Sequence, residues 1–278
     1  CKRKLPQNIS VMHIDHGIHP DSESWSELVK ETCSNLGFDY ELKKVSIAKY
    51  GKNVEYAARQ ARYEAFCKSG ADSLILAHHM NDQIETFFLK LLRGSGIRGL
   101  KSMPVKSPCW YDESVSVIRP LLNVSRNTIE MYAACNDIKY CEDPSNTNTR
   151  YDRNYIRHSI WPVVIDRFDI ADINISKSIH LLGEAWELTT VLAENDLNLC
   201  NNSDGSLDWG SLKKLGTIRI KNVLLHILGK YQVYGYSIGH IEQFATGLTE
   251  ATLDSKNELY VKGFRMRKHG KRIIIEQL

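Results

Sequence analysis

The first half of the chain alternates short apolar runs of strand type with stretches whose apolar residues recur at helical spacing. Residues 9–14 and 73–77 are strand-like, and the unbroken apolar run of 73–77 is typical of a strand buried on both faces of a parallel sheet. A helix is predicted between Asp21, a good N-cap, and Gly37, a helix stop. These repeated strand–helix units predict right-handed crossovers and an α/β fold with a doubly wound, mostly parallel sheet.

The second half has a different pattern. From about residue 166 a long helical stretch, 176–197, leads to a turn-rich break at 201–205. Beyond it the spacing predicts a small α+β module, with helices near 216–230 and 237–247 and strands at 258–261 and 272–276. We therefore predict three parts: an α/β domain (1–165), a helical linker (166–200) and a small C-terminal α+β module (201–278).

Composition narrows the class of protein. With 42% hydrophobic and 25% charged residues in 278, the chain matches an ordinary globular protein, and no apolar run is long enough for a membrane span. The basic first residues lack the apolar core of a signal peptide. Seven cysteines without a CxxC pair predict a reduced, cytoplasmic chain and argue against a cluster site.

Basic residues gather at the C-terminal end. The last seventeen residues contain one acid, Glu276, and six bases, namely Lys262, Arg265, Arg267, Lys268, Lys271 and Arg272. Such a patch can bind nucleic-acid phosphates, although a charge run is more often a solvated face.

The most informative polar residues follow the strand at 73–77, where the ligands of such sheets bind. Asp82 and Glu85 are three residues apart on a predicted helix, so they share a face beside His78 and His79. Two carboxylates beside histidines can hold Mg²⁺, an ammonium group or a proton in transit. They can equally stabilise the first helical turn through its dipole. Spacing alone leaves both interpretations open.

Other candidates are also ambiguous on their own. Arg93 precedes a Gly-Ser-Gly run that can form an anion-binding concavity or a helix stop. Arg62 can reach a phosphate at the edge of the sheet. Arg153 and Arg157, at i and i+4, can clamp RNA phosphates or form an ion pair. The run from His13 to Gly17 invites a zinc interpretation, but a structural turn is favoured because no thiolate lies nearby.

Seven motifs occur together in the order and approximate spacing of one family. They lie at 13–17, 58–63, 78–86, 93–96, 119–122, 143–146 and 153–157. In this register residues 8–165 resemble the tRNA(Ile)-lysidine synthases, which are PP-loop (N-type) ATP pyrophosphatases. Residues 200–278 look like that family's first C-terminal, substrate-binding module, so the resemblance implies that the part at 201–278 binds the substrate or tRNA.

The resemblance implies a reaction. ATP adenylates O2 of the wobble cytidine of a tRNA(Ile) with a CAU anticodon, and the ε-amine of L-lysine then attacks C2 and expels AMP. Asp82 would hold Mg²⁺ or the ammonium group, Glu85 the amine, Arg62 the α-phosphate, and His78 the nucleotide or lysine. The ATP-binding residues would be His13, His16 and Gly17, together with Arg62 and His78. The tRNA-binding residues would be Arg93, Arg153, Arg157, Arg265, Arg267 and Lys268.

One departure affects the expected activity. The family's SerGlyGlyxAspSer loop, which holds pyrophosphate, is absent from residues 1–278, so we expect this polypeptide alone not to adenylate RNA. Two alternatives stay open: a truncated relative that only binds tRNA, and another PP-loop tRNA modifier such as a 2-thiocytidine synthetase. The latter is disfavoured because its chemistry uses paired cysteines. A homodimer is a further open possibility.

Overall fold

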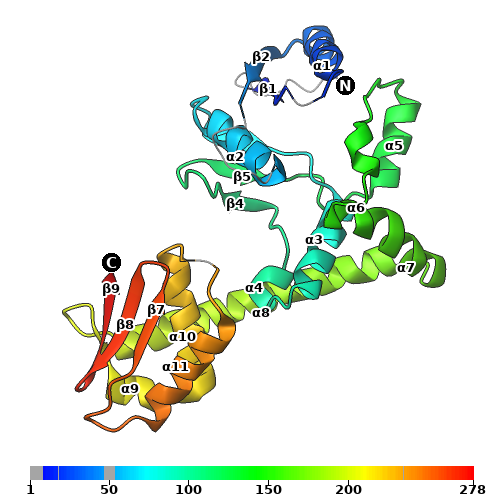
Figure 1. Cartoon of the computed structure of the whole chain (residues 1–278). Helices are drawn as coiled ribbons and strands as arrows, with labels where there is room; N and C mark the ends of the chain where they lie inside the picture. Colours follow the sequence, from blue (N-terminus) through cyan, green and yellow to red (C-terminus); the bar gives the residue numbers. More distant parts are fainter. Residues whose placement is uncertain (1–8, 18, 47–53, 234) are drawn as a thin grey trace. The chain divides into compact units, whose positions relative to one another are not determined.

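A computed structural model describes residues 9–17, 19–46, 54–233 and 235–278 (Figure 1). The chain divides into two compact units, residues 1–179 and 180–278. The division lies within one long helix, α8 (Ala171–Cys200), which occupies most of the predicted linker.

The first unit begins with one strand–helix–strand crossover. Strand β1 (Ser10–Asp15) pairs in parallel with β2 (Asp39–Lys44), and α1 (Ser22–Leu36) connects them. Gly37 ends α1 with a φ of 75°, a left-handed conformation that glycine adopts without steric cost. The helix predicted between Asp21 and Gly37 is therefore confirmed.

A second sheet carries the candidate site. Helix α2 (Val54–Cys67) leads to β3 (Ser73–Ile75), which is parallel to β5 (Ser116–Ile118), and β4 (Lys106–Pro108) joins β5 in antiparallel register. The fold is the mostly parallel α/β type that the sequence predicts. Within the described ranges, however, no ladder joins β1–β2 to the order β3-β5-β4.

The prediction that residues 73–77 are buried on both faces is wrong. Only Leu74 of β3 is buried, and the side chain of Ile75 is 60% exposed. The buried face packs on the core formed by Tyr63, Cys109 and Val117, whereas described residues do not cover the other face. Strand β4 was not predicted, because its three residues end in a proline and show no alternation of apolar and polar side chains.

The rest of the first unit is mostly helical. Helix α3 (Met80–Leu92) directly follows β3 and buries Ile84 against Trp161 and Ala171. The remaining helical elements of this unit are α4 (Ile97–Leu100), α5 (Arg126–Cys135), η2 (Pro144–Thr147), α6 (Asp152–Tyr155), the π-helix η3 (Ile156–Ile160) and α7 (Trp161–Arg167).

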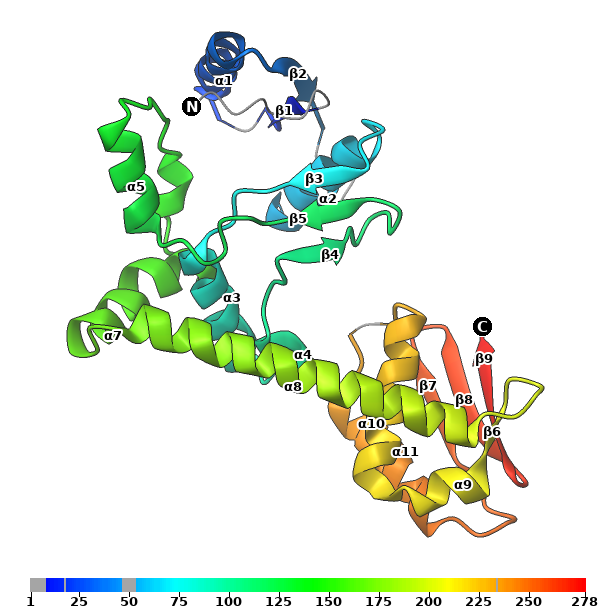
Figure 2. The ribbon, with the colours of Figure 1, turned by 180° about the vertical axis from the view of Figure 1, so that it is seen from behind.

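The second unit is an α+β module, as the sequence predicts. Its antiparallel sheet has the order β6-β9-β8-β7 (Figure 2). The elements that follow α8 are β6 (Leu207–Asp208), α9 (Trp209–Lys214), α10 (Gly216–Lys230), α11 (Ile238–Glu250), β7 (Glu258–Val261), β8 (Phe264–His269) and β9 (Arg272–Gln277). One face of the sheet and these helices enclose a core that includes Leu224, Leu248 and Met266.

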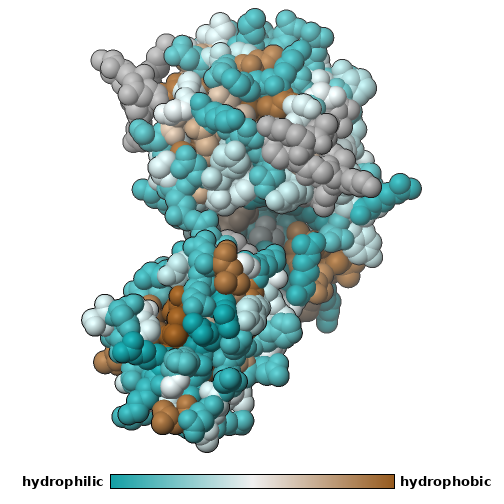
Figure 3. Space-filling model, turned by 60° about the vertical axis from the view of Figure 1, so that its left-hand side comes forward, coloured by the Kyte–Doolittle hydropathy of each residue, from teal (hydrophilic) through white to brown (hydrophobic). Residues whose placement is uncertain are grey.

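The surface drawn in Figure 3 is mostly hydrophilic, with separate hydrophobic patches. Among the helices that the structure describes, none has the length and apolar character needed to cross a membrane.

Candidate active site

The site is built around the start of α3, immediately after β3. His79 is the N-cap residue, in extended conformation, and its backbone N–H donates to Oδ2 of Asp82 over 2.9 Å. This bond satisfies one of the amide groups that a helix start leaves unpaired. Asp82 thus has the helix-stabilising role that the sequence left open, and its other oxygen faces the site.

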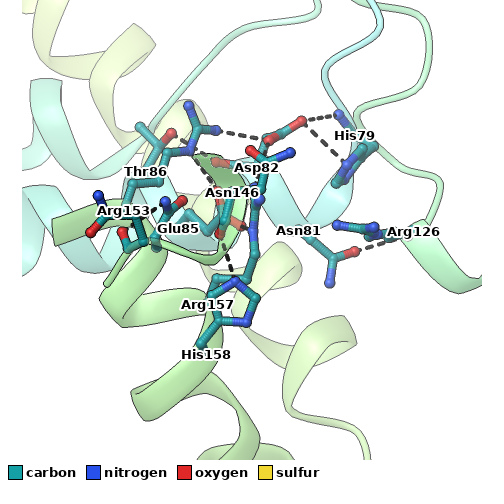
Figure 4. A network of polar contacts seen from close by, with 12 residues as sticks. His79, Asn81, Asp82, Glu85, Thr86, Arg126, Asn146, Arg153, Arg157 and His158 are labelled. Carbon is teal, nitrogen blue, oxygen red and sulfur yellow. Dashed lines mark hydrogen bonds and ion pairs between the residues drawn. The ribbon is translucent and has the colours of Figure 1, made fainter. Parts of the chain in front are cut away.

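Two arginines converge on the acidic pair from a distant part of the chain (Figure 4). Arg153 donates from Nη2 to Oδ1 of Asp82 over 2.8 Å and from Nε to Oε2 of Glu85 over 2.5 Å. Arg157 donates from Nε to Oε1 of Glu85 over 2.6 Å and from Nη2 to Oε2 over 3.1 Å. The predicted amine-binding and tRNA-binding residues therefore form one ion-pair network.

The two carboxylates of this network are largely buried, which strengthens their electrostatic attraction to the guanidiniums. The side chain of Glu85 is only 4% exposed and that of Asp82 13%, so both charges lie where water screens them little. Two carboxylates and two guanidiniums balance in formal charge. An exposed pair of the same type, Arg93 with Asp152 at 2.8 Å, lies at the surface with side chains 63% and 71% exposed.

Histidines border the network. Burial lowers the pKa of His78 to about 4, and the positive charges of Arg119, Arg153 and Arg59 act in the same direction, while Asp82 opposes them. His78 is therefore neutral at pH 7, where it acts as a hydrogen-bonding group. The Nδ1 atoms of His78 and His79 are buried and have no hydrogen-bond partner among the described residues.

Two arginines near His78 were not predicted as site residues from the sequence. Arg59 of α2 lies with its Cζ 5.2 Å from the centre of the Tyr63 ring. Arg119, which follows β5, is 7% exposed and donates to the carbonyl of Pro104 over 3.0 Å. The Arg-Pro-Leu-Leu motif at 119–122 was the available signal for Arg119, while Arg59 has no local signal apart from its place in the motif at 58–63.

Three of the predicted ATP-binding residues, His13, His16 and Gly17, lie in or directly after β1. Gly17, with a φ of 63°, donates its N–H to Oδ1 of Asp15 over 2.8 Å, which forms the structural turn favoured by the sequence. Burial lowers the pKa of His16, and the positive charge of Arg62 lowers it further. Burial also lowers the pKa of His13. Arg62 is thus near His16, and within the described ranges no hydrogen bond or ion pair joins it to Asp82 or Glu85.

These side chains alone do not form a magnesium site. Both oxygens of Asp82 are engaged, one with His79 and one with Arg153. In the described part of the chain no group of three or more histidines, cysteines or acids could hold a metal ion. The described side chains therefore do not form a complete metal site by themselves, although one or two carboxylates are enough for a Mg²⁺ ion that is also bound by the phosphates of a nucleotide.

The remaining predicted RNA contacts have other partners than the acids of this network. Arg93 ends α3, and Gly94 after it has a φ of 68°, so the Arg-Gly-Ser-Gly run includes a helix stop. In the second unit, Arg265 and Arg267 alternate with buried residues of β8 and pair with Glu276. Lys268 is only 3% exposed and donates to the carbonyl of Leu253 over 2.8 Å, so it is not presented to a phosphate.

Comparison with known proteins identifies the family. A family model described as the PP-loop domain matches residues 1–164. The chain is 37% identical over 227 residues to the tRNA(Ile)-lysidine synthase of Hydrogenovibrio crunogenus, covering 80% of this chain and 54% of that protein. It is 36% identical over 222 residues to that of Coxiella burnetii, covering 79% and 49%, and 32% identical over 264 residues to that of Nitrosomonas europaea, covering 94% and 57%.

The chain thus spans about half the length of these curated relatives. A solved structure of the U34-tRNA thiolase NcsA from Methanococcus maripaludis has a TM-score of 0.48 and 15% identity, covering 62% of this chain and 61% of that one, and a likeness of this size carries no argument. The match to residues 1–164, which contain every residue of the ion-pair network, shows that this chain belongs to the PP-loop domain family.

Proposed function

We propose that this chain is the PP-loop part of an ATP-dependent tRNA-modifying enzyme that ligates L-lysine to C2 of the wobble cytidine of tRNA(Ile) with a CAU anticodon. The proposed intermediate is a cytidine adenylated at O2. The observation that carries the proposal is the buried Asp82–Glu85 pair, set among guanidiniums and neutral histidines where β3 ends. The names of the relatives support the same assignment.

ATP fits the polar groups around His78. The buried Nδ1 atoms of His16, His78 and His79 have no partner among the described residues, so they are available to polar atoms of a ligand. Arg59, Arg62 and Arg119 supply positive charge on the same side. Fixed guanidiniums stabilise the charge that develops on a phosphate during adenylyl transfer, and they need no reorganisation. Arg62 is proposed for the α-phosphate and His78 for orientation.

The acidic pair is proposed to receive the amine of lysine. A substrate ammonium placed there must replace an existing cation, because both carboxylates are already compensated. Arg153 is the more exposed of the two arginines, with 32% of its side chain exposed against 20% for Arg157. Arg153 is therefore the guanidinium that we expect to exchange, after which it can contact an RNA phosphate. Transfer of the ammonium proton to a carboxylate would leave the neutral amine that attacks C2.

Recognition of the tRNA is proposed to use several basic side chains. Arg93, Arg153 and Arg157 belong to the first unit, and Arg265 and Arg267 belong to the second. The last two already pair with Glu258 or Glu276, so a phosphate would have to compete with those acids. ATP and Mg²⁺ are the proposed cofactors, with Asp82 as the carboxylate proposed for the ion beside the phosphates of ATP.

Lysidine formation in the Asp82→Ala variant tests the proposal. The protein is expressed from the complete reading frame that contains these residues, and lysine incorporation into tRNA is measured with ATP present. We expect the Asp82→Ala variant to lose activity at least about 100-fold, because it loses a group at the reacting amine. Asp152→Ala is the matched control, since Asp152 also pairs with an arginine but is 71% exposed, and it should retain activity.

The outcome separates two classes of function. Wild-type turnover in a folded Asp82→Ala variant would refute the assignment. A salt-dependent affinity for tRNA without any cleavage of ATP in the wild type would favour the alternative, a relative that only binds tRNA.

A further inference from the structure

Two cysteines far apart in the sequence bring their sulfur atoms together in the first unit. Cys67 is the last residue of α2, and Cys109 directly follows β4. Their Sγ atoms are 3.5 Å apart, and one thiol donates a hydrogen bond to the other. Among the six described free cysteines this is the one sulfur–sulfur contact: Cys33 and Cys200 are each buried elsewhere, and Cys135 and Cys141 are exposed.

The surrounding packing holds the two sulfurs in place. One helical turn before Cys67, the Tyr63 ring lies 5.2 Å from the ring of Trp110, the residue after Cys109. The N–H of Cys109 donates to the carbonyl of Val115 over 2.7 Å, which closes the β4–β5 hairpin. The seam between α2 and the hairpin therefore has an aromatic contact beside a thiol contact. Tyr63, Cys67 and Cys109 belong to one apolar cluster, and the ring of Trp110 lies at its exposed edge.

We propose that Cys67 and Cys109 are an oxidation site that closes to an intramolecular disulfide when the protein meets a low-molecular-weight disulfide such as oxidised glutathione. A disulfide has an S–S distance of about 2.05 Å, so the sulfurs must approach by roughly 1.5 Å. Rotation about the Cα–Cβ bonds of both residues can supply an approach of this size. Neither the proposed lysine ligation nor any nucleotide enters this inference.

The reaction proceeds in two exchanges. Cys67 is partly exposed and Cys109 is fully buried, so the thiolate of Cys67 attacks the small disulfide first and releases one small thiol. Cys109 then loses its proton and attacks Sγ of Cys67, releasing the second small thiol. The two protein thiols are oxidised and the small disulfide is reduced to two thiols, so atoms and electrons balance.

The environment sets the rate of the first exchange. Burial, together with the hydrogen bond to Cys109, raises the pKa of Cys67 to about 12. The attacking thiolate is therefore scarce at pH 7, and its fraction rises about tenfold for each unit of pH up to that value. Oxidation of this site is slow at neutral pH and accelerates as the pH rises.

The cross-link would restrain the cationic side of the candidate site. Helix α2 carries Arg59 and Arg62, and β5 of the hairpin leads directly into Arg119. A disulfide across the seam would fix these two elements to each other and close a loop between positions 67 and 109. Such a loop restricts the unfolded chain, so we expect the melting temperature of the first unit to rise by about 5 °C or more on oxidation.

Peptide mapping of the wild-type protein tests the proposal. The folded protein is incubated with oxidised glutathione at pH 7 and pH 8.5, remaining thiols are alkylated, and the digest is analysed by mass spectrometry. We expect a peptide pair linked through Cys67 and Cys109, formed faster at pH 8.5, with Cys135 and Cys141 recovered as mixed disulfides. In protein unfolded by urea the exposed thiols should react faster, but the links should no longer be confined to Cys67 and Cys109, because the folded seam no longer holds these two sulfurs together.

Serine variants provide the matched controls. Cys67→Ser should abolish the link and the rise in melting temperature, whereas Cys135→Ser should leave both unchanged. Recovery of alkylated Cys67 and Cys109 from wild-type protein after prolonged oxidation at pH 8.5 would overturn the proposal. Links that join either residue to Cys135 or Cys141 would also overturn it. Both outcomes are read from the wild-type protein, so neither depends on whether a serine variant folds.

Discussion

Glu85 holds a negative charge with only 4% of its side chain exposed, and two guanidiniums compensate it. Burying an ion is unfavourable unless partners and hydrogen bonds offset the lost hydration. The i,i+3 spacing of Asp82 and Glu85 and the i,i+4 spacing of Arg153 and Arg157 each predicted a shared face. That the two faces meet could not be predicted, because the bonds join residues 68 to 72 positions apart.

Removing the charge of Glu85 tests how far the network supports the fold. Glu85→Gln should lower the free energy of unfolding by about 3 kcal/mol, because two partly buried guanidiniums lose a common partner. Urea denaturation measures this change. The control is Glu184→Gln, whose 56%-exposed carboxylate pairs with the exposed His180, and it should cost less than about 0.5 kcal/mol. Equal losses in the two variants would contradict this account of the network.

The neutral state of His78 predicts a dependence of stability on pH. Burial lowers its pKa in the folded protein to about 4, below the unfolded value, so the unfolded chain binds the proton more tightly. The resulting stabilisation is complete above about pH 6.5 and is lost as the pH falls from there to about 4, by at most ~3 kcal/mol.

The His78→Gln variant isolates this contribution, because glutamine stays neutral over the whole range. Urea denaturation at a series of pH values should give a smaller acid-induced loss of stability for the variant than for the wild type. Some dependence should remain, since burial also lowers the pKa values of His13, His16 and His79. Parallel curves for variant and wild type would show that His78 is not held neutral.

At the scale of elements, caps, stops and several strands, β7 and β9 among them, were predictable, whereas β4 and β8 were not. Ser125 accepts a hydrogen bond from the N–H of Thr128 over 3.1 Å and starts α5, as its residue type predicts. Strand β8 was missed because its arginines suggested a charged patch, although they alternate with buried Phe264 and Met266. A period of two marks a strand, but only the packed helices decide which side of it is buried.

Gln83 ties α3 to the segment before β4. Its side chain donates to the carbonyl of Met103 over 2.6 Å and accepts from the N–H of Met103 over 2.9 Å, with 9% of the residue exposed. Gln83→Ala leaves both backbone groups without a protein partner and should cost about 2 kcal/mol in urea denaturation. Gln60→Ala, which removes one bond to the hydroxyl of Tyr56 near the surface, should cost clearly less. Similar losses would mean that water replaces the bonds of Gln83.

At the scale of the whole molecule, the change of pattern near residue 166 indicated a division of the chain. The pairing of strands across the first unit was less predictable, because parallel strands are joined by contacts far apart in sequence. The candidate site depends on such contacts as well, which is why local spacing identified its acids and arginines but not Arg59 or the partner of each charge.

A cavity in the core of one unit should lower the stability of that unit and leave the other unchanged. Leu224 is fully buried in the core of the second unit, and Leu224→Ala should destabilise that unit by about 2–5 kcal/mol through the cavity it leaves. Hydrogen–deuterium exchange should then lose protection in α10, α11 and β8, while amides of α3 and β5 keep theirs. Equal loss in both units would show that they unfold as one cooperative block.

ATP-dependent incorporation of labelled lysine into a tRNA(Ile) transcript tests the proposed function most directly. The protein is expressed from the complete reading frame that contains these residues, and two transcripts are compared that differ only in the wobble base. The account predicts stable incorporation of lysine into the transcript with cytidine at that position and none into the transcript with uridine. Failure to label the cytidine transcript, with a folded protein that binds it, would contradict the account.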